Sequence, residues 1–309
     1  MRDVEATLSD VLGAEAALSK STVSRVCQAI KDEFDTWETR DLGEASLEYL
    51  FLDGSHFRMR DGARAAPVLA AWEITSEGRP ALVGLDSAAS ESTDAWQGFL
   101  DGLVTRGLRA PLLMVSDAAP GLISGVEVVF PSSLRQRCAI HRCRNVLAKG
   151  PVEHQAEVKV AYWAIFDPTG EVPGEKSIAV ARKRAVKFSA TFGRRFPSAV
   201  TCFDEDLTSL FSYLRFPTEH HKRIRHSNFI ERTFDETRRR VKVIGRLLAG
   251  AVVPVAGVGG AGPGQPGMAR GDTTPVSVRH LQELRRQLPD RETEKPATAK
   301  STKAVTAAA

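Results

Sequence analysis

The sequence predicts a mixed α/β fold, and the order of its apolar patterns supports this prediction. Three strand-like segments follow one another without a helical pattern between them, at residues 47–52, 67–75 and 81–85. Helical and strand-like patterns then alternate, at 94–108, 111–116, 122–130 and 134–140. Three successive strands indicate a mixed sheet, because a doubly wound fold alternates strand and helix throughout.

Local signals support the individual elements. The run 47–52 stops at Asp53-Gly54, and the turn residues Gly-Arg-Pro at 78–80 separate the second strand from the third. The helix at 94–108 has its large apolar side chains on one face, namely Trp96, Phe99, Leu100 and Leu103. Residues 18–30 also have helical spacing, and they suit either the recognition helix of a helix-turn-helix or an ordinary amphipathic helix.

The second half of the chain is predicted to be mostly helical. Aromatic residues in 150–220 are interpreted as core rather than as a stacking platform for bases. Residues 228–244 are predicted to form a basic helix. Residues 247–267 are rich in Gly, Ala, Val and Pro without an amphipathic period, so we expect them to be poorly ordered. A short helix is expected at 279–288, before a polar end that is also expected to be disordered.

Composition restricts the class of protein. The 309 residues carry a net charge of +4, with 42% hydrophobic and 26% charged residues, which excludes a disordered or fibrous chain. No apolar run approaches the roughly 20 residues of a membrane span, and the first residues lack the apolar segment of a secretory signal. Four cysteines are too few for a disulfide framework, so reduced thiols and a cytoplasmic location are expected.

Positive charge is concentrated in two segments. Residues 222–246 contain nine Lys and Arg against three acids, and residues 135–149 contain five against none. Such clusters favour a polyanionic partner, because each phosphate contact releases counterions. A single cluster is equally well explained as a solvated helix face, but two clusters flanking one core favour nucleic acid.

Three acidic residues stand at the ends of predicted elements, where active sites on sheets are common. Asp53 ends the first strand, Asp117 ends the fourth, and Glu231 lies in the first turn of the basic helix. Each also has a purely structural interpretation. Asp53 with Gly54 fits a hairpin turn, and Asp117 fits the N-cap of the next helix. Glu231 fits a capping box with Asn228.

As a set, the three acids predict a divalent metal site. Neighbouring strand ends can bring Asp53 and Asp117 together, and a helix crossing the sheet can add Glu231. Mg²⁺ prefers carboxylate oxygens of this kind. Two ions about 4 Å apart can activate a water or a 3′-hydroxyl and stabilise the leaving oxygen of a phosphoryl transfer.

Cys138 and His141 have half the spacing of a zinc finger. The chain has no second matching pair, so a zinc site would need ligands from distant segments. Two buried side chains that order the strand end near Asp117 are the preferred interpretation.

These motifs occur together in one known family. Residues 49–54 (YLFLDG), 115–122 (VSDAAPGL), 136–147 (QRCAIHRCRNVL), 228–232 (NFIER) and 238–245 (RRRVKVIG) resemble the Mutator-type transposases of bacterial insertion sequences. The resemblance runs from about residue 2 to residue 246, with the motifs in the family's order. The combination is specific, although no single motif would be.

The resemblance implies a ribonuclease H-like core that is interrupted by a helical insertion. Asp53, Asp117 and Glu231 match the family's Asp-Asp-Glu triad, which binds two Mg²⁺ ions or possible Mn²⁺ substitutes. Cys138 and His141 match its Cys-x-x-His element, whose expected role is either structural or to contact DNA. The expected partners are double-stranded DNA, as terminal inverted repeats and target, and further copies of the chain on that DNA. The expected phosphate contacts are Arg232, Arg238, Arg239, Arg240, Lys242, Arg142 and Arg144.

The resemblance also implies a division of the chain. Residues 1–42 would be the helical end of a DNA-binding region, so the chain is expected to start inside that region. The core would occupy 43–149, the insertion 150–220 and the helix with the third acid 221–246. The tail, 247–309, departs from the family over 247–267 and resembles it again around 279–288, as a segment read in another frame would.

The sequence therefore predicts a cytoplasmic, nucleoid-associated transposase that cuts and joins DNA by metal-dependent phosphoryl transfer. The main alternative is a catalytically inactive DNA-binding remnant of such an enzyme. A helix-turn-helix regulator is a third possibility, but it leaves the acids at the strand ends unexplained. Strand cleavage with Mg²⁺ distinguishes the first from the other two.

Overall fold

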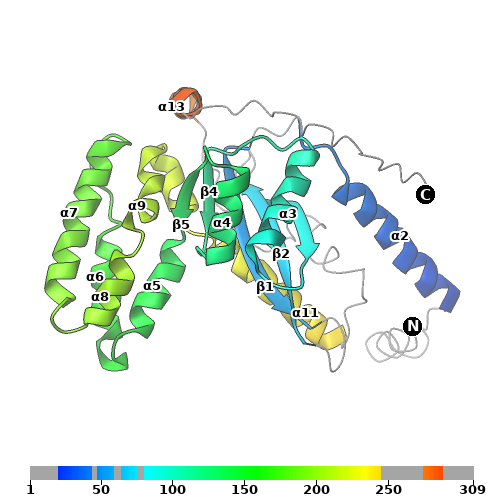
Figure 1. Ribbon diagram of the computed structural model, residues 1–309, viewed down its shortest axis with the longest axis horizontal. Coiled ribbons are helices and arrows are strands. Elements are labelled where there is room, and N and C mark those ends of the chain that lie inside the picture. Colours follow the sequence, from blue (N-terminus) through cyan, green and yellow to red (C-terminus); the bar gives the residue numbers. More distant parts are fainter. Residues whose placement is uncertain (1–19, 44–46, 59–63, 75–79, 245–273, 288–309) are drawn as a thin grey trace, which may run out of the picture.

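The protein is built around a five-stranded mixed sheet with helices on both faces (Figure 1), as the predicted α/β class requires. The computed structural model describes residues 20–43, 47–58, 64–74, 80–244 and 274–287. The order across the sheet is β3-β2-β1-β4-β5; the first three are antiparallel neighbours, and β4 and β5 run parallel to β1. The strands are β1 (Tyr49–Phe57), β2 (Ala66–Ile74), β3 (Pro80–Ser87), β4 (Leu113–Ser116) and β5 (Leu134–Arg137).

All five predicted strands are present, but two of them end at least three residues away from the predicted position. β1 continues to Phe57 instead of ending at residue 52, because β2 pairs with it as far as Ala66 opposite Phe57. β5 ends at Arg137 instead of residue 140, because helix α5 (Ala139–Ala148) begins there. Most of the expected turn at 78–80 lies outside the described residues.

Side chains that alternate along β1 contribute to two cores. Leu50 and Leu52 pack with the apolar faces of α3 (Thr93–Thr105) and α4 (Pro120–Val129). Phe51 points to the opposite side, where its ring lies 5.0 Å from that of Phe229 on α11 (Asn228–Ile244). α4 sits close to the loop before α3, since a Cβ on Gly121 would lie 2.5 Å from a backbone oxygen there. The predicted apolar face of α3 is buried, and it consists of Trp96, Phe99, Leu100 and Leu103.

The segment between β5 and α11 is helical, as predicted, and its aromatic residues form a core. Tyr162 and Phe203 are fully buried, and the Tyr162 hydroxyl donates to the carbonyl oxygen of Ala139 at 2.7 Å. The helices are α6 (Gln155–Ala164), α7 (Glu175–Phe192), α8 (Pro197–Asp204), α9 (Leu207–Leu210) and α10 (His221–Ile224), with short 3-10 turns at Val152–His154, Ser212–Arg215 and Thr218–His220.

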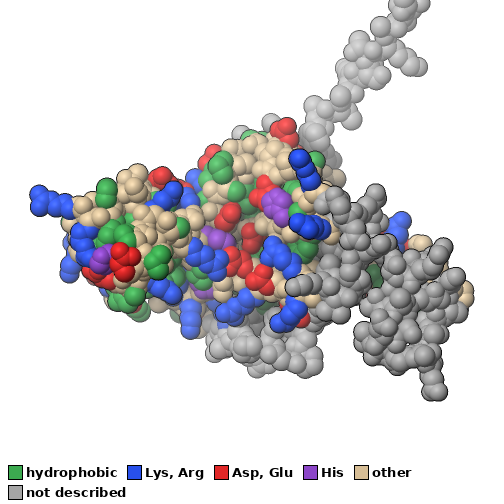
Figure 2. Space-filling model, turned by 90° about the horizontal axis from the view of Figure 1, so that it is seen from below, with side chains coloured by type: hydrophobic (Ala, Val, Ile, Leu, Met, Phe, Trp, Pro, Cys, Tyr) green, Lys and Arg blue, Asp and Glu red, His purple; other side chains and the backbone are tan. Residues whose placement is uncertain are grey.

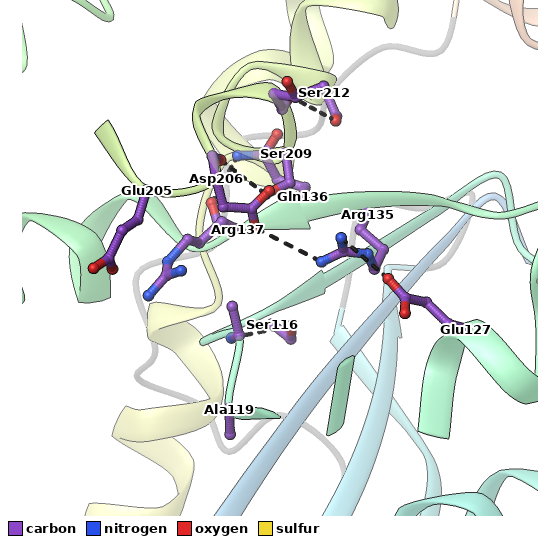
Figure 3. Close-up of polar contacts among 12 residues, drawn as sticks. Ser116, Ala119, Glu127, Arg135, Gln136, Arg137, Glu205, Asp206, Ser209 and Ser212 are labelled. Atoms are coloured by element: carbon purple, nitrogen blue, oxygen red, sulfur yellow. Dashed lines mark hydrogen bonds and ion pairs between the residues drawn. The ribbon is translucent and has the colours of Figure 1, made fainter. Parts of the chain in front are cut away.

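Edge strand β5 attaches this helical segment to the sheet. Arg135 lies between Glu127 of α4, at 3.3 Å, and Asp206 before α9, at 3.7 Å (Figure 3). The buried amide of Gln136 donates to the Leu210 carbonyl at 2.9 Å and accepts the Tyr213 N–H at 2.8 Å. These bonds satisfy the buried side-chain amide of Gln136 and fix the helical segment beside β5.

Two further helices complete the described chain. α2 (Lys20–Glu38) contains the predicted helix at 18–30 from residue 20 and extends beyond it. α13 (Pro275–Gln287) confirms the helix predicted at 279–288, and its Arg285 donates to the carbonyl oxygens of Leu47 and Ala110, both at 3.1 Å. The segment 247–267 and the polar end lie outside the described residues. None of the described helices is both long enough and apolar enough to cross a membrane.

Candidate active site

Asp53 lies within β1, where its side chain is buried. It stands opposite Ala70 in the antiparallel ladder with β2, so the predicted strand end and the alternative hairpin turn at this position are both wrong. Pairing with β4 stops earlier, at Phe51 opposite Val115. Asp53 is therefore two residues past the point where β1 loses its parallel neighbour.

Asp117 follows directly after β4 and lies level with Asp53. The parallel register of β1 and β4, continued past the end of β4, sets these two residues opposite each other. Neighbouring strands are about 4.8 Å apart, and the negative charge of Asp117 acts on Asp53, so the two aspartates are close to each other. The Asp117 carboxylate accepts the Ala119 N–H at 3.0 Å, and Ala118 between them has a φ of 66°. This left-handed alanine is a strained conformation of the kind found at functional sites.

The N-cap interpretation of Asp117 is also wrong. α4 begins at Pro120, and its N-cap position is occupied by Ala119, which has no side-chain acceptor. Asp117 stabilises the turn from two residues further upstream, through one of its two carboxylate oxygens. The other oxygen is not needed for that turn.

Glu231 in the first turn of α11 contacts helix α5. Nε2 of His141 lies 2.6 Å from Oε1 of Glu231, and the guanidinium of Arg144 donates to the same oxygen. α11 already includes Asn228, so that residue is not the N-cap that a capping box requires. The Oε1 atom of Glu231 is thus bound by tertiary contacts with α5, while its Oε2 accepts the side-chain amide of Asn228, at the start of its own helix, at 3.1 Å.

The three acids interact electrostatically. Burial and the negative charge of Asp117 raise the pKa of Asp53 to about 7, against the opposing influence of His141, and Glu231 adds to the rise. Burial would also raise the pKa of Glu231, but the hydrogen bond from Arg144 and the charge of His141 lower it. Negative charge is therefore gathered at this point and partly compensated by two cationic side chains of α5.

Cys138 and His141 connect β4, α5 and the loop before α11. The N–H of Cys138 donates to the Ser116 carbonyl at 2.7 Å, and its Sγ accepts the Ser227 N–H at 3.4 Å. Burial would lower the pKa of His141, but its interaction with the Cys138 thiol and the acids around it raise the pKa to about 9. The contact of His141 with Glu231 was not apparent from the sequence, because 90 residues separate them.

The donor set suits a hard divalent cation. Asp53 and Asp117 offer carboxylate oxygens from adjacent strands, and a cation between them would relieve the repulsion that raises the pKa of Asp53. Within the described ranges, no three His, Cys, Asp or Glu side chains are already placed to share an ion. Glu231 would first have to exchange its bonds with Arg144 and His141.

One predicted DNA contact is wrong. Arg142 is fully buried, and its guanidinium donates to the carbonyl oxygens of Cys202 and Glu205 at the end of α8. A side chain without exposed surface cannot reach a phosphate. Its position in a basic segment suggested a surface role, whereas its actual role is to hold α5 against α8.

The other arginines predicted to contact DNA differ in their exposure and in their partners within the protein. Arg232 is exposed, Arg239 pairs with Glu236, and Arg238 donates to Asp235 and to Ser55 on β1. The side chains of Arg240 and Lys242 lie outside the described part of the chain. Figure 2 shows a face of the molecule with Asp, Glu and His side chains near its centre and Lys and Arg side chains around them. Such a surface can neutralise a phosphate backbone around an acidic site.

Glu91 is an additional acid close to β1 that sequence analysis missed. Its carboxylate is 3.5 Å from Nδ1 of His56, and a Cβ on Gly54 would lie 2.8 Å from it. Glu91 precedes α3 in an irregular segment, where no periodic pattern marks it. Only the folded chain brings it beside the strand that carries Asp53.

Comparison with known proteins identifies the family. The family described as "Transposase, Mutator family" matches residues 1–248. The chain belongs to the Mutator family of transposases. This confirms the resemblance seen in the motifs of the sequence.

Several curated members of the transposase family resemble the chain over most of its length. The transposase for insertion sequence element IS6120 of Mycolicibacterium smegmatis is 33% identical over 241 residues, which cover 78% of this chain and 72% of the relative. The transposase for IST2 of Acidithiobacillus ferrooxidans is 29% identical, with 77% and 78% covered. The transposase for ISRM5 of Rhizobium meliloti is 28% identical, and the match spans 79% of this chain but 59% of that longer relative.

Proposed function

We propose that this protein is a DNA transposase that cuts and joins the ends of its element by metal-dependent phosphoryl transfer. The observation that carries the proposal is the pair of aspartates: Asp53 lies on β1, Asp117 directly follows the adjacent parallel strand β4, and the charge of Asp117 acts on Asp53. A mixed sheet with helices on both faces is compatible with the ribonuclease H-like core that the resemblance implies. Glu231, whose charge acts on Asp53, would be the third acid.

The three acids would hold two Mg²⁺ ions, with Mn²⁺ as a possible substitute. Asp53, Asp117 and Glu231 would supply the carboxylate oxygens that hold the ions. Bound ions of this kind lower the pKa of a water and offset charge on a leaving oxygen. His141 and Arg144 would hold Glu231 in place until it binds an ion, because both contact its Oε1.

The reaction would proceed in two displacements at phosphorus. In cleavage, the oxygen of water bonds to phosphorus and the bond to the 3′-oxygen breaks, which leaves a 3′-hydroxyl on the element end. In joining, that hydroxyl loses its proton, attacks a phosphate of the target strand and displaces another 3′-oxygen. One phosphodiester is broken and one formed in the second step, so no external energy source is required.

The substrate would be duplex DNA, both as terminal inverted repeats and as target. The exposed Arg232 and the paired Arg239 on α11 would hold phosphates near the acids. We further propose that several copies of the chain assemble on the DNA, in a bacterial cytoplasm and at the nucleoid.

The test is the exchange of Glu231 for glutamine. Glu231→Gln keeps the size of the side chain but removes its charge, so cleavage of element-end DNA with Mg²⁺ should be abolished while DNA binding remains. Glu153→Gln, a change of the same chemistry at an exposed position, should cleave like the parent. Equal cleavage by Glu231→Gln and the parent would remove Glu231 from the site.

The second candidate function is a DNA-binding remnant without catalysis. The engagement of Glu231 by His141 and Arg144 favours it, because the third acid is not free to bind an ion. This candidate predicts that the parent binds element-end DNA but cleaves none of it with Mg²⁺ or Mn²⁺. The same assay therefore decides between the two functions.

A further inference from the structure

Helix α7 and the turn that follows it present a row of positive side chains on the face directed away from the core. The buried face of α7 consists of residues spaced three or four apart, among them Ile178, Ala185 and Phe192. Lys176, Lys183, Lys187 and Arg194, spaced seven, four and seven residues apart, are all exposed. With 3.6 residues per turn the three lysines fall on one line of α7, opposite the buried face, and Arg194 follows in the turn after the helix. We call them the α7 stripe.

The positive charge of the α7 stripe is not neutralised by neighbouring acids. Glu175, the acid next to the stripe in the sequence, pairs with Arg215 at 2.7 Å. Asp204 on the adjacent helix accepts a hydrogen bond from Ser189 at 2.8 Å. In the part of the chain that the structure describes, none of the four stripe side chains forms an ion pair.

The α7 stripe is far from the basic residues of α11. Figure 1 places α7 at one end of the long axis of the molecule, with α8 and α5 between it and α11. Lys and Arg side chains are distributed over the face in Figure 2 from that end to the acidic centre. The three lysines span about 16 Å along the helix, comparable to several phosphates of a DNA strand.

We infer that the α7 stripe binds the phosphate backbone of duplex DNA that extends beyond the candidate active site. Three exposed lysines in a line on α7 and an exposed arginine in the turn after it complement a polyanion of uniform charge. Contacts to phosphates alone would bind duplex DNA of any sequence. The inference rests on the proposed function in one respect, that DNA is the polyanion. It adds a second contact, on the helical segment, that holds DNA flanking the cut.

The test compares two variants that lose the same charge. The stripe variant changes Lys176, Lys183, Lys187 and Arg194 to Gln, and the control variant changes the exposed off-stripe residues Arg64, Arg109, Lys159 and Arg182 to Gln. Binding to a duplex of about four helical turns is measured by fluorescence anisotropy over a series of salt concentrations, in EDTA. The slope of log K against log salt should fall by up to about 3.6 for the stripe variant, at roughly 0.9 per contact, and by much less for the control.

A second measurement needs no variant. Acetylation of lysines in the parent, followed by mass spectrometry, should show Lys176, Lys183 and Lys187 protected by the same duplex and Lys159 unprotected. Equal slopes for the two variants, or stripe lysines that remain as reactive as without DNA, would overturn the inference. Both readouts are independent of cleavage, so failure of the proposed catalysis would leave them interpretable.

Discussion

His141 and Glu231, separated by 90 residues in the sequence, lie 2.6 Å apart between Nε2 and Oε1 and join the first turn of α5 to the first turn of α11. The contact directs the third acid of the proposed triad toward the helix that carries the Cys-x-x-His element. It makes the geometry of that acid dependent on α5 rather than on α11 alone. The stability of the protein and its affinity for cations should therefore respond to changes on both helices.

Asp53→Asn should stabilise the ion-free protein more at pH 8 than at pH 5. The pKa of Asp53 is raised from 3.8 to about 7, so the folded protein holds this proton more tightly than the unfolded chain does. The stability that this proton provides is lost as pH rises through 7. The asparagine does not ionise, and its advantage should be larger by about 2–3 kcal/mol at the higher pH. Urea unfolding in EDTA measures the difference, and a gain that does not change with pH would contradict the assigned environment.

His141→Gln should destabilise the protein more at pH 6 than at pH 9.5. The pKa of His141 is raised from 6.5 to about 9, so the stability that its charge provides is full below 6.5 and disappears as pH passes 9. The expected loss at pH 6 is about 1–3 kcal/mol. His154→Gln, at a more exposed histidine, serves as the control for the loss of an imidazole.

Arg144→Gln should change stability little and increase the affinity for divalent cations. The Arg144 side chain is 56% exposed, and surface ion pairs contribute about 0–1 kcal/mol. Release of Glu231 from this pair should tighten Mg²⁺ binding without DNA by at most about fivefold. Isothermal titration calorimetry measures it, with Lys149→Gln at the end of the same helix as control. Weaker Mg²⁺ binding by Arg144→Gln than by the parent would refute the idea that Arg144 and the cation compete for Glu231.

Arg142→Ala should destabilise the protein by about 3 kcal/mol or more, because it removes a fully buried side chain whose guanidinium donates to the carbonyl oxygens of Cys202 and Glu205. The salt dependence of DNA binding should remain that of the parent, because Arg142 has no exposed surface. Urea unfolding and anisotropy measure the two quantities. A lower salt slope in the folded variant would restore Arg142 to the predicted phosphate contacts.

The combined change of Arg239 and Arg240 to Ala should weaken DNA binding and leave stability nearly unchanged, the reverse of the effects expected for Arg142→Ala. Arg239 is exposed on α11, so its removal should affect the free energy of unfolding little. The log–log salt slope of DNA binding should fall by roughly 0.9 for each phosphate that the variant no longer binds, whatever the sequence of the duplex. Weakening on one sequence alone would indicate base readout instead.

Local patterns in the sequence were sufficient for the elements and for the choice of acids. Strand and helix periods depend on neighbouring residues, so five strands and the bounds of α11 could be predicted. The extent of β1 could not, because its last residues are held by β2 rather than by their own pattern. The basic composition of 135–149 likewise could not distinguish Arg144 at the surface from Arg142 in the core.

The sequence by itself determined the mixed α/β class, the family motifs and the three acids, since all of these are written in short segments. Only the tertiary structure decided that Asp53 lies level with Asp117, that His141 and Arg144 hold Glu231, and that Arg142 is internal. Each of these depends on the register between strands or on the packing of α5 against α8 and α11. Such contacts join residues that are distant in the chain, and no local period specifies them.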